Sequence, residues 1–313
     1  MERPLCLVTG GSGLVGRAIS AEIDDSADFF FASSADADLR DYSSTRNLFE
    51  RVKPTHVIHL AARVGGLFAN MADNLGFFED NIAINSNIVK CCHLQKIHSA
   101  VFCLSTCVFP AEADCPITEE SLHKGRPHFS NEGYAYSKRM LECLVRYYRE
   151  AYGYKNWICV IPTNIYGPCD NFSLSDGHVI PALIQKCVIA KESESDFIVS
   201  GSGRPLRQFI FVSDLAKIIL QLLMFQDHQE HIYICCDSEC EVSIGEIAKM
   251  ISEAVSFKGS IVFDATKPDG IQRKTASNKR LKERLHDFKF TLLSVGIQKT
   301  TEWFLAHRDV ART

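Results

Sequence analysis

The first half of the chain alternates short apolar runs with amphipathic stretches. Apolar runs of about five residues are typical of strands buried in a parallel sheet, and they lie at 5–9, 29–33, 56–62, 100–105 and 157–161. Stretches with apolar residues three and four apart are typical of helices, and they lie at 17–23, 74–96 and 134–152. Strands that alternate with helices predict an α/β fold with a doubly wound parallel sheet.

Glycines mark the first turn from strand to helix, where the sequence satisfies GxGxxG. The loop consists of Gly10, Gly11, Ser12, Gly13, Leu14, Val15 and Gly16. Such glycines allow a tight turn, let backbone amides approach a pyrophosphate and let the helix pack on its strand. This position in the chain predicts a dinucleotide cofactor bound at the N-terminus of the first helix, in a Rossmann-type domain.

The rhythm becomes irregular after about residue 171. A helical pattern at 178–191 is followed by short apolar runs at 197–199 and 208–212 and by an apolar helix at 214–225. Ser243 and Glu246 predict a capping box for a helix that runs to about Val255. We therefore expect a Rossmann domain over residues 1–168, with a returning segment near 207–230, and a smaller α+β substrate domain over 169–313.

The end of the second apolar run normally distinguishes NAD from NADP. An acidic residue there binds the ribose 2′-hydroxyl of NAD, whereas an arginine accepts the 2′-phosphate of NADP. The chain has Ser33, Ser34 and Ala35 at this point. The absent acid weakens the case for NAD, and the absent arginine leaves NADP unproven. Asp38 and Leu39, a few residues on, are candidates for contact with the adenine.

Tyr134 and Lys138 are four residues apart at the start of a helical pattern. Residues at this spacing share a helix face, so the ammonium can lie beside the phenol. A fixed positive charge favours the phenolate and lowers the pKa of the tyrosine, which would let the pair exchange a proton with a carbonyl or alcohol oxygen. By itself the spacing favours an exposed tyrosine and a solvated lysine, because the pattern is common by chance. Its place among segments that follow strand ends favours chemistry, because ligands of such sheets bind there.

Composition excludes several classes of partner. A net charge of −4 over 313 residues gives no reason to expect nucleic acid or an anionic membrane. No apolar run approaches the roughly 20 residues that span a bilayer, and the first five residues lack the apolar core of a signal peptide. Without a secretory signal, the thirteen cysteines are expected to be reduced thiols of a cytoplasmic protein.

A metal site is not expected. Cys235, Cys236 and Cys240 lie near His228 and His231 in the sequence. Structural zinc sites use two ligand pairs at characteristic spacings, and adjacent cysteines point to alternate faces while no second pair has the usual spacing.

The motif Thr9-Gly10-x-x-Gly13-x-x-Gly16, combined with Tyr134-x-x-x-Lys138, resembles the extended short-chain dehydrogenase/reductase family. Within it, six segments are similar to the GDP-L-fucose synthases: 56–66, 104–110, 162–168, 170–172, 177–181 and 207–210. Those enzymes convert GDP-4-keto-6-deoxy-D-mannose with NADPH, as 3,5-epimerases and 4-reductases. The resemblance therefore implies this substrate, NADP(H) as cofactor, and a homodimer formed through the helices near 74–96 and 134–152.

The resemblance also implies roles for five catalytic residues. Protons on C3 and C5 are acidic because both carbons flank the C4 ketone; Cys107 is the candidate base and His178 the acid that reprotonates. Ser105 and Tyr134 would hold the C4 oxygen, where enolate charge collects. Tyr134 would then protonate the alkoxide after reduction, while Lys138 tunes Tyr134 and binds the nicotinamide ribose. Taken singly, Cys107 is typical of a small core residue, so the joint occurrence of the five carries the interpretation.

Further binding positions follow from the same resemblance. The residues expected beside the nicotinamide are Pro162, Thr163, Asn164, Ile165 and His178. The residues expected to bind the GDP-sugar are Lys186, Ser200, Arg207 and Asp269. A cation beside the diphosphate and an acid beside the guanine are chemically reasonable. Ser200 stands where the family usually has a tryptophan, and Leu206 stands where a basic residue is often found.

Two alternatives remain open from the sequence. The first is another NAD(P)-dependent sugar-nucleotide epimerase or dehydratase; a 4-epimerase with tightly held NAD would show no net consumption of NADPH. The second is a catalytically silent NADP-binding scaffold, which would have no need to keep all five catalytic residues.

Overall fold

The structure, a computed structural model, describes residues 3–313 except the side chains of residues 67 and 68. Contacts divide the chain into two compact units, which are described separately. Unit 1 comprises the chain up to Ala113, Thr118–Pro162 and Leu215–Cys235, and unit 2 comprises Asp114–Ile117, Thr163–Asp214 and Cys236–Thr313.

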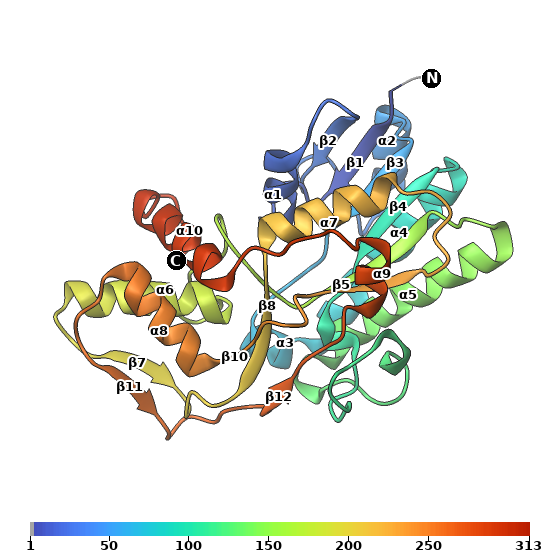
Figure 1. The fold of residues 1–313 in the computed structure, drawn as a ribbon. Coiled ribbons are helices and arrows are strands. Elements are labelled where there is room, and N and C mark those ends of the chain that lie inside the picture. The colour runs from blue at the N-terminus through green and yellow to red at the C-terminus, as the bar shows by residue number, and fades with distance from the viewer. Residues whose placement is uncertain (1–2) are drawn as a thin grey trace. The chain divides into compact units, whose positions relative to one another are not determined.

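Unit 1 is built on a six-stranded, wholly parallel sheet in the order β2-β1-β3-β4-β5-β9 (Figure 1). Its strands are β1 Leu5–Thr9, β2 Asp28–Ala32, β3 His56–His59, β4 Ser99–Cys103, β5 Trp157–Pro162 and β9 Ile232–Cys235. Every residue of β3, β5 and β9 is buried, as expected of strands covered on both faces. The predicted doubly wound parallel sheet is therefore confirmed.

Helices flank this sheet, and several begin or end close to the residues that the sequence pattern predicts. They are α1 Leu14–Glu22, α2 Tyr42–Val52, α3 Leu67–Ala72, α4 Asn74–Leu94, α5 Glu132–Tyr152 and most of α7 Val212–Met224. Three short 3-10 helices are η1 Thr106–Val108, η2 Glu119–Ser121 and η3 Phe129–Asn131. Helix α2 was not expected, although Asp41 marks its start by accepting a hydrogen bond from the Ser44 amide at 2.6 Å. Helices α4 and α5 pack against each other.

The sixth strand of this sheet, β9, was not predicted from the sequence. It is four residues long and pairs with β5, with Ile232 opposite Cys159. A run this short carries little periodicity of its own. Tertiary pairing with a buried neighbour, rather than local pattern, therefore selects the strand conformation.

Unit 2 contains smaller sheets. Strand β8 Leu206–Phe211 pairs antiparallel with β10 Glu241–Ser243 and parallel with β6 Asn164–Tyr166 and β12 Arg273–Lys274. Strand β7 Phe197–Ser200 pairs with β11 Ile261–Asp264. The helices are α6 Val179–Glu192, α8 Ile244–Val255, α9 Lys279–Arg284 and α10 Leu293–Ala306. A core of buried apolar side chains is formed mainly by α6, α8, α10 and the strands β7 and β8.

The predicted capping box of α8 is confirmed. The Ser243 hydroxyl accepts from the Glu246 amide at 3.2 Å, and the Ser243 amide donates to the Glu246 carboxylate at 2.8 Å. By contacts, β6 belongs to unit 2 and the segment Leu215–Cys235 to unit 1. The division into folding domains at 1–168 and 169–313 stays a prediction.

No helix within residues 3–313 has both the length and the apolar character that crossing a bilayer requires.

Candidate active site

The glycine loop is a tight turn that packs closely against the protein's own backbone. Gly10 has a φ of +71°, and a Cβ placed on it would lie 2.8 Å from the amide nitrogen of Ala61. A Cβ on Gly16 would lie 2.7 Å from the Gly10 carbonyl oxygen. Gly13 is the N-cap of α1, so no side chain caps the first amides of the helix. These amides remain available to a pyrophosphate, and the predicted loop therefore fits a dinucleotide.

The end of β2 has an ion pair, between Asp36 and Arg51, that the local sequence did not reveal. Both the amide and the hydroxyl of Ser33 donate to the carboxylate of Asp36, at 2.9 and 3.0 Å. The guanidinium of Arg51, which comes from α2, lies 3.5 Å from the same carboxylate. An arginine near this strand end suits a ribose 2′-phosphate. Sequence reasoning missed Arg51 because it lies a whole helix away from Ser33 along the chain.

Tyr134 and Lys138 share one face of α5, as their spacing predicts. The ammonium of Lys138, which is 2% exposed, lies 5.7 Å from the centroid of the Tyr134 ring and donates to the carbonyl of Cys103 at 2.7 Å. Burial lowers the pKa of Lys138, while negative charge on Cys103 and Cys107 would raise it.

The expected lowering of the Tyr134 pKa is wrong. Burial raises its pKa well above the ordinary value, and negative charge on Cys107 or Cys103 would raise it further. The physical reason is that removing the phenolate from water costs more than the ammonium of Lys138 returns, since that ammonium is bonded to a carbonyl. Tyr134 is therefore a neutral phenol, suited to donating a hydrogen bond or a proton.

Helix α5 also fixes the turn that carries Ser105 and Cys107. The Ser105 hydroxyl accepts from the Cys107 amide at 3.4 Å at the start of η1. Arg139, which is 5% exposed, donates from Nε to the carbonyl of Val108 at 2.6 Å. A negative charge on Cys107 would raise the pKa of Tyr134, so Cys107 on the turn and Tyr134 on the helix interact electrostatically.

The structure thus brings four of the five predicted catalytic residues together in unit 1. The sequence did not single out Arg139. The usable signal was its position directly after Lys138 in the predicted helix. Arg139 touches the backbone of the turn rather than any reacting group, and we regard it as a positioning residue.

A chain of buried hydrogen bonds connects the central strands of the sheet to the segment of α5 that carries Lys138. Nε2 of His59 donates to Oδ1 of Asn85 at 3.1 Å, and Nδ1 accepts from the Thr9 hydroxyl at 2.8 Å. Asn85 in turn donates to the carbonyl of Ser137 at 3.2 Å, one residue before Lys138. Burial lowers the pKa of His59 to about 3, so its imidazole is neutral. The chain ties β1, β3, α4 and α5 to one another without adding a charge.

His178 belongs to unit 2, where it is the N-cap of α6. Its Nδ1 lies 3.7 Å from Oδ1 of Asp170, and 71% of its side chain is exposed. Asp170 is 2% exposed, and its carboxylate raises the pKa of His178 above the ordinary value. The imidazolium form suits a proton donor. Asp170 lies in the segment 170–172 that carries the family resemblance, but the sequence did not single it out as a site residue.

The expected GDP-sugar residues also lie in unit 2. Lys186 is half-buried on α6, and Ser200 is exposed at the end of β7. Arg207 on β8 donates to the Leu206 carbonyl at 2.8 Å, and burial lowers its pKa. Asp269 accepts from the amide and the hydroxyl of Ser202, at 2.6 and 2.7 Å, and so holds the loop that follows β7.

The expected nicotinamide residues fall at the end of β5 and in β6. Pro162 and Thr163 are buried, and the Thr163 hydroxyl has no hydrogen-bond partner within the part of the chain that the structure describes. Asn164 is exposed and donates to the Gln208 carbonyl at 2.8 Å, while Ile165 is half-buried. An unpartnered buried hydroxyl is a polar group for which a ligand could provide a partner.

Comparison with known proteins identifies the family of this chain. Residues 6–236 match the model of the NAD dependent epimerase/dehydratase family. A GDP-L-fucose synthase of Dictyostelium discoideum is 49% identical over 310 residues, covering 98% of this chain and 97% of that protein. The chain belongs to the GDP-L-fucose synthase family.

Other members of the family agree. A GDP-L-fucose synthase of Escherichia coli is 32% identical over 321 residues and covers 99% of each chain. The crystal structure of a GDP-L-fucose synthetase from Naegleria fowleri bound to NADP has a TM-score of 0.95 and 43% identity, with 100% of this chain and 96% of that chain covered. The expected family and the expected Rossmann-type fold are both confirmed.

Proposed function

We propose that this chain is an NADPH-dependent enzyme that converts GDP-4-keto-6-deoxy-D-mannose to GDP-L-fucose. The reaction comprises epimerisation at C3 and C5 and reduction at C4. The observation that carries the proposal is the group formed in unit 1 by Ser105, Cys107, Tyr134 and Lys138, in a chain that matches GDP-L-fucose synthases along nearly its whole length.

Epimerisation uses the acidity of the protons beside the ketone. Cys107 removes a proton from C3 or C5, and the enolate charge collects on the C4 oxygen. Ser105 and the neutral phenol of Tyr134 donate hydrogen bonds to that oxygen, which stabilises the charge as it develops. His178, whose pKa is raised by Asp170, returns the proton as imidazolium.

Reduction uses the same oxygen-binding group. Bound NADPH supplies a hydride to C4 of the sugar. Tyr134 then protonates the alkoxide, because a phenol with a raised pKa holds its proton until a stronger base is next to it. The ammonium of Lys138 favours the tyrosinate that is left, and it is held in place by the Cys103 carbonyl.

For the cofactor we propose contacts from the glycine loop, Lys138 and Pro162 of unit 1 and from Thr163, Asn164, Ile165 and His178 of unit 2. The loop accepts the pyrophosphate, and Arg51 near the end of β2 favours the 2′-phosphate of NADP(H). For the GDP-sugar we propose Lys186 and Arg207 beside the diphosphate. Asp269 is proposed beside the guanine, and Ser200 is proposed as a further contact to the GDP-sugar.

The decisive experiment supplies the purified chain with GDP-4-keto-6-deoxy-D-mannose and NADPH. We expect NADPH absorbance to fall in proportion to product, and the product to be GDP-L-fucose. Turnover of the sugar without net NADPH consumption would point instead to a 4-epimerase and would refute the proposal.

The role of Cys107 is tested in deuterated water. Cys107→Ser should abolish deuterium incorporation at C3 and C5 of the substrate while leaving NADPH binding unchanged. Cys115→Ser is the matched control, since Cys115 is a half-buried thiol whose sulfur lies 3.8 Å from the Arg273 carbonyl oxygen. Full exchange in Cys107→Ser would remove this thiol from the mechanism.

We also propose a homodimer formed through α4 and α5. These helices form an apolar groove of about 220 Å³. Its lining residues are Ile82, Asn85, Ser86, Met140, Leu141, Cys143, Leu144 and Tyr147. Met140 and Tyr147 expose 38% and 56% of their surface, which a second copy would cover.

We place the protein in the cytoplasm because all thirteen cysteines, each within residues 3–313, lie outside disulfides.

A further inference from the structure

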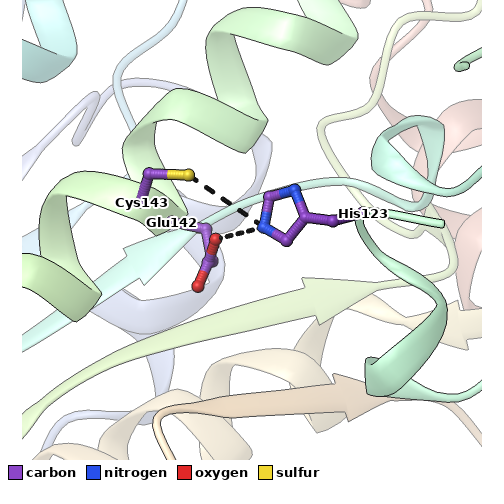
Figure 2. Close-up of side chains that lie close together, drawn as sticks. All are labelled: His123, Glu142 and Cys143. Carbon is purple, nitrogen blue, oxygen red and sulfur yellow. Dashed lines mark hydrogen bonds and ion pairs between the residues drawn. The ribbon is translucent and has the colours of Figure 1, made fainter. Parts of the chain in front are cut away.

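A cluster of ionisable side chains lies on α5 beyond Lys138 and has no role in the proposed reaction. Glu142 is 1% exposed, and its Oε2 accepts from Nε2 of His123 at 2.7 Å. The sulfur of Cys143 lies 4.0 Å from the same nitrogen (Figure 2). One ligand atom of each residue lies within 4.8 Å of those of the other two. The three residues are called the α5 cluster below.

We propose that the α5 cluster binds a divalent transition-metal ion of the zinc class through His123 Nε2, a Glu142 carboxylate oxygen and Cys143 Sγ. Imidazole nitrogen, carboxylate oxygen and thiolate sulfur are the donors that zinc prefers in proteins. Three protein ligands leave the fourth position of a tetrahedral site to water.

The distances require little movement. With metal–sulfur and metal–nitrogen bonds of about 2.3 and 2.1 Å, a tetrahedral site separates sulfur and nitrogen by about 3.6 Å. The observed separation of Cys143 Sγ from His123 Nε2 is 4.0 Å. Nitrogen and oxygen would stand about 3.3 Å apart, and the observed separation is 2.7 Å. These two separations therefore need to change by well under 1 Å, and the third, between the Cys143 sulfur and the Glu142 carboxylate, is no more than 4.8 Å.

The surroundings hold two of the ligands in place. Glu142 and Cys143 lie on α5, a helix of 21 residues. His231 donates from Nε2 to the other carboxylate oxygen of Glu142 at 2.8 Å, and its own carbonyl accepts from the Cys159 amide of β5 at 2.7 Å. Such an outer hydrogen bond orients a ligating carboxylate. His123 comes from the loop after η2 and exposes 47% of its side chain, so it can adjust.

Arg146 is the feature that opposes a cation. Its Nε donates to Glu142 at 3.2 Å, and its Nη2 lies 3.8 Å from the Cys143 sulfur. It has other partners further along the helix, because it lies 3.7 Å from the Glu150 carboxylate and 4.5 Å from the centroid of the Tyr147 ring. The guanidinium can therefore leave the ligands without losing every contact. Its removal should strengthen metal binding.

The test titrates the full-length chain, in its native oligomeric state, with Co²⁺ as a spectroscopic substitute and with Zn²⁺ in competition. We expect one Co²⁺ per chain, a near-ultraviolet thiolate-to-cobalt band, and loss of that band when Zn²⁺ is added. Cys143→Ser should abolish the band, and His123→Ala should weaken binding at least about tenfold. Arg146→Ala should tighten it.

Matched controls separate this site from other thiols and imidazoles. Cys240→Ser and Cys107→Ser should keep the band, and His286→Ala, which removes an imidazole that is 80% exposed, should keep the affinity. The proposal is overturned if neither the unaltered chain nor Arg146→Ala gives a thiolate band, or if the band survives in Cys143→Ser. Because the readout is spectroscopic, it is independent of the proposed enzymatic function.

Discussion

At the residue scale, burial sets the protonation state of one candidate catalytic group and a neighbouring charge sets that of another. Tyr134 has an ammonium 5.7 Å from its ring, yet its pKa is raised because the phenol is removed from water. His178 is exposed and responds to its neighbour instead, so Asp170 raises its pKa. A neutral phenol and a protonated imidazole are both acids, which suits one group that stabilises an enolate oxygen and another that returns a proton.

The link between Asp170 and His178 predicts a pH effect. Asp170→Asn removes the charge that raises the pKa of His178, so less imidazolium remains as the pH rises. We expect the epimerisation rate to be little changed near pH 6 and several-fold lower near pH 8. Deuterium incorporation at C3 and C5, followed as a function of pH, measures it.

Asp176→Asn is the control for this effect, since the Asp176 carboxylate accepts a hydrogen bond from the Ser175 hydroxyl at 2.7 Å in the loop before α6. An equal fractional loss of rate at every pH in Asp170→Asn would mean that the carboxylate does not act through the protonation of His178.

At the element scale, α5 organises unit 1. It carries Tyr134 and Lys138 on one face and reaches the turn η1 through Arg139. This turn carries Cys107. One helix therefore sets the distance between the proton donor Tyr134 and the candidate base Cys107. Placing a site on a regular element restricts the geometry more than placing it on a loop does.

Arg139→Met tests this positioning. The change leaves the buried Val108 carbonyl without its donor, a loss of roughly 1–3 kcal/mol in the free energy of unfolding. We expect deuterium exchange at C3 and C5 to fall at least about tenfold, because a displacement of about 1 Å is costly to catalysis. NADPH affinity should change little, since the glycine loop lies on other elements.

Arg139→Lys provides the rescue, because an ammonium can also donate to the Val108 carbonyl. We expect it to restore part of the exchange rate and part of the stability. If Arg139→Met instead weakened exchange and NADPH binding equally, the residue would be stabilising unit 1 as a whole rather than positioning the turn.

At the scale of the whole molecule, the apolar groove on α4 and α5 bears on assembly. Met140 and Tyr147 are partly exposed there, beside the buried Leu141. Met140→Asp introduces a charge that a second copy would have to bury without a partner, which is strongly unfavourable. We expect this variant to be a monomer where the unaltered chain is a dimer, as measured by light scattering after size exclusion.

Leu292→Asp is the matched control for assembly. Leu292 is 72% exposed in unit 2, so its replacement should leave both the fold and the dimer unchanged. If Met140→Asp remained dimeric, the proposed interface through α4 and α5 would be wrong.

Sequence by itself determined the elements whose signals are local. The glycine loop is one, because the spacing of its glycines predicts the tight turn in which Gly10 adopts a φ of +71°. The capping box at Ser243 and the shared face of Tyr134 and Lys138 are others, since each depends on spacings of three or four residues. Buried parallel strands such as β5 are also visible, because their short length and their alternation with helical patterns distinguish them from buried helices.

Tertiary structure alone decided features that depend on contacts between distant residues. Strand β9 exists because β5 offers it a pairing edge, and Arg51 reaches the end of β2 from a separate helix. Desolvation of Tyr134 likewise depends on what the folded chain packs around it. The physical reason is common to all three: backbone preferences act over a few residues, whereas burial and charge act through space, and a sequence does not state distances in space.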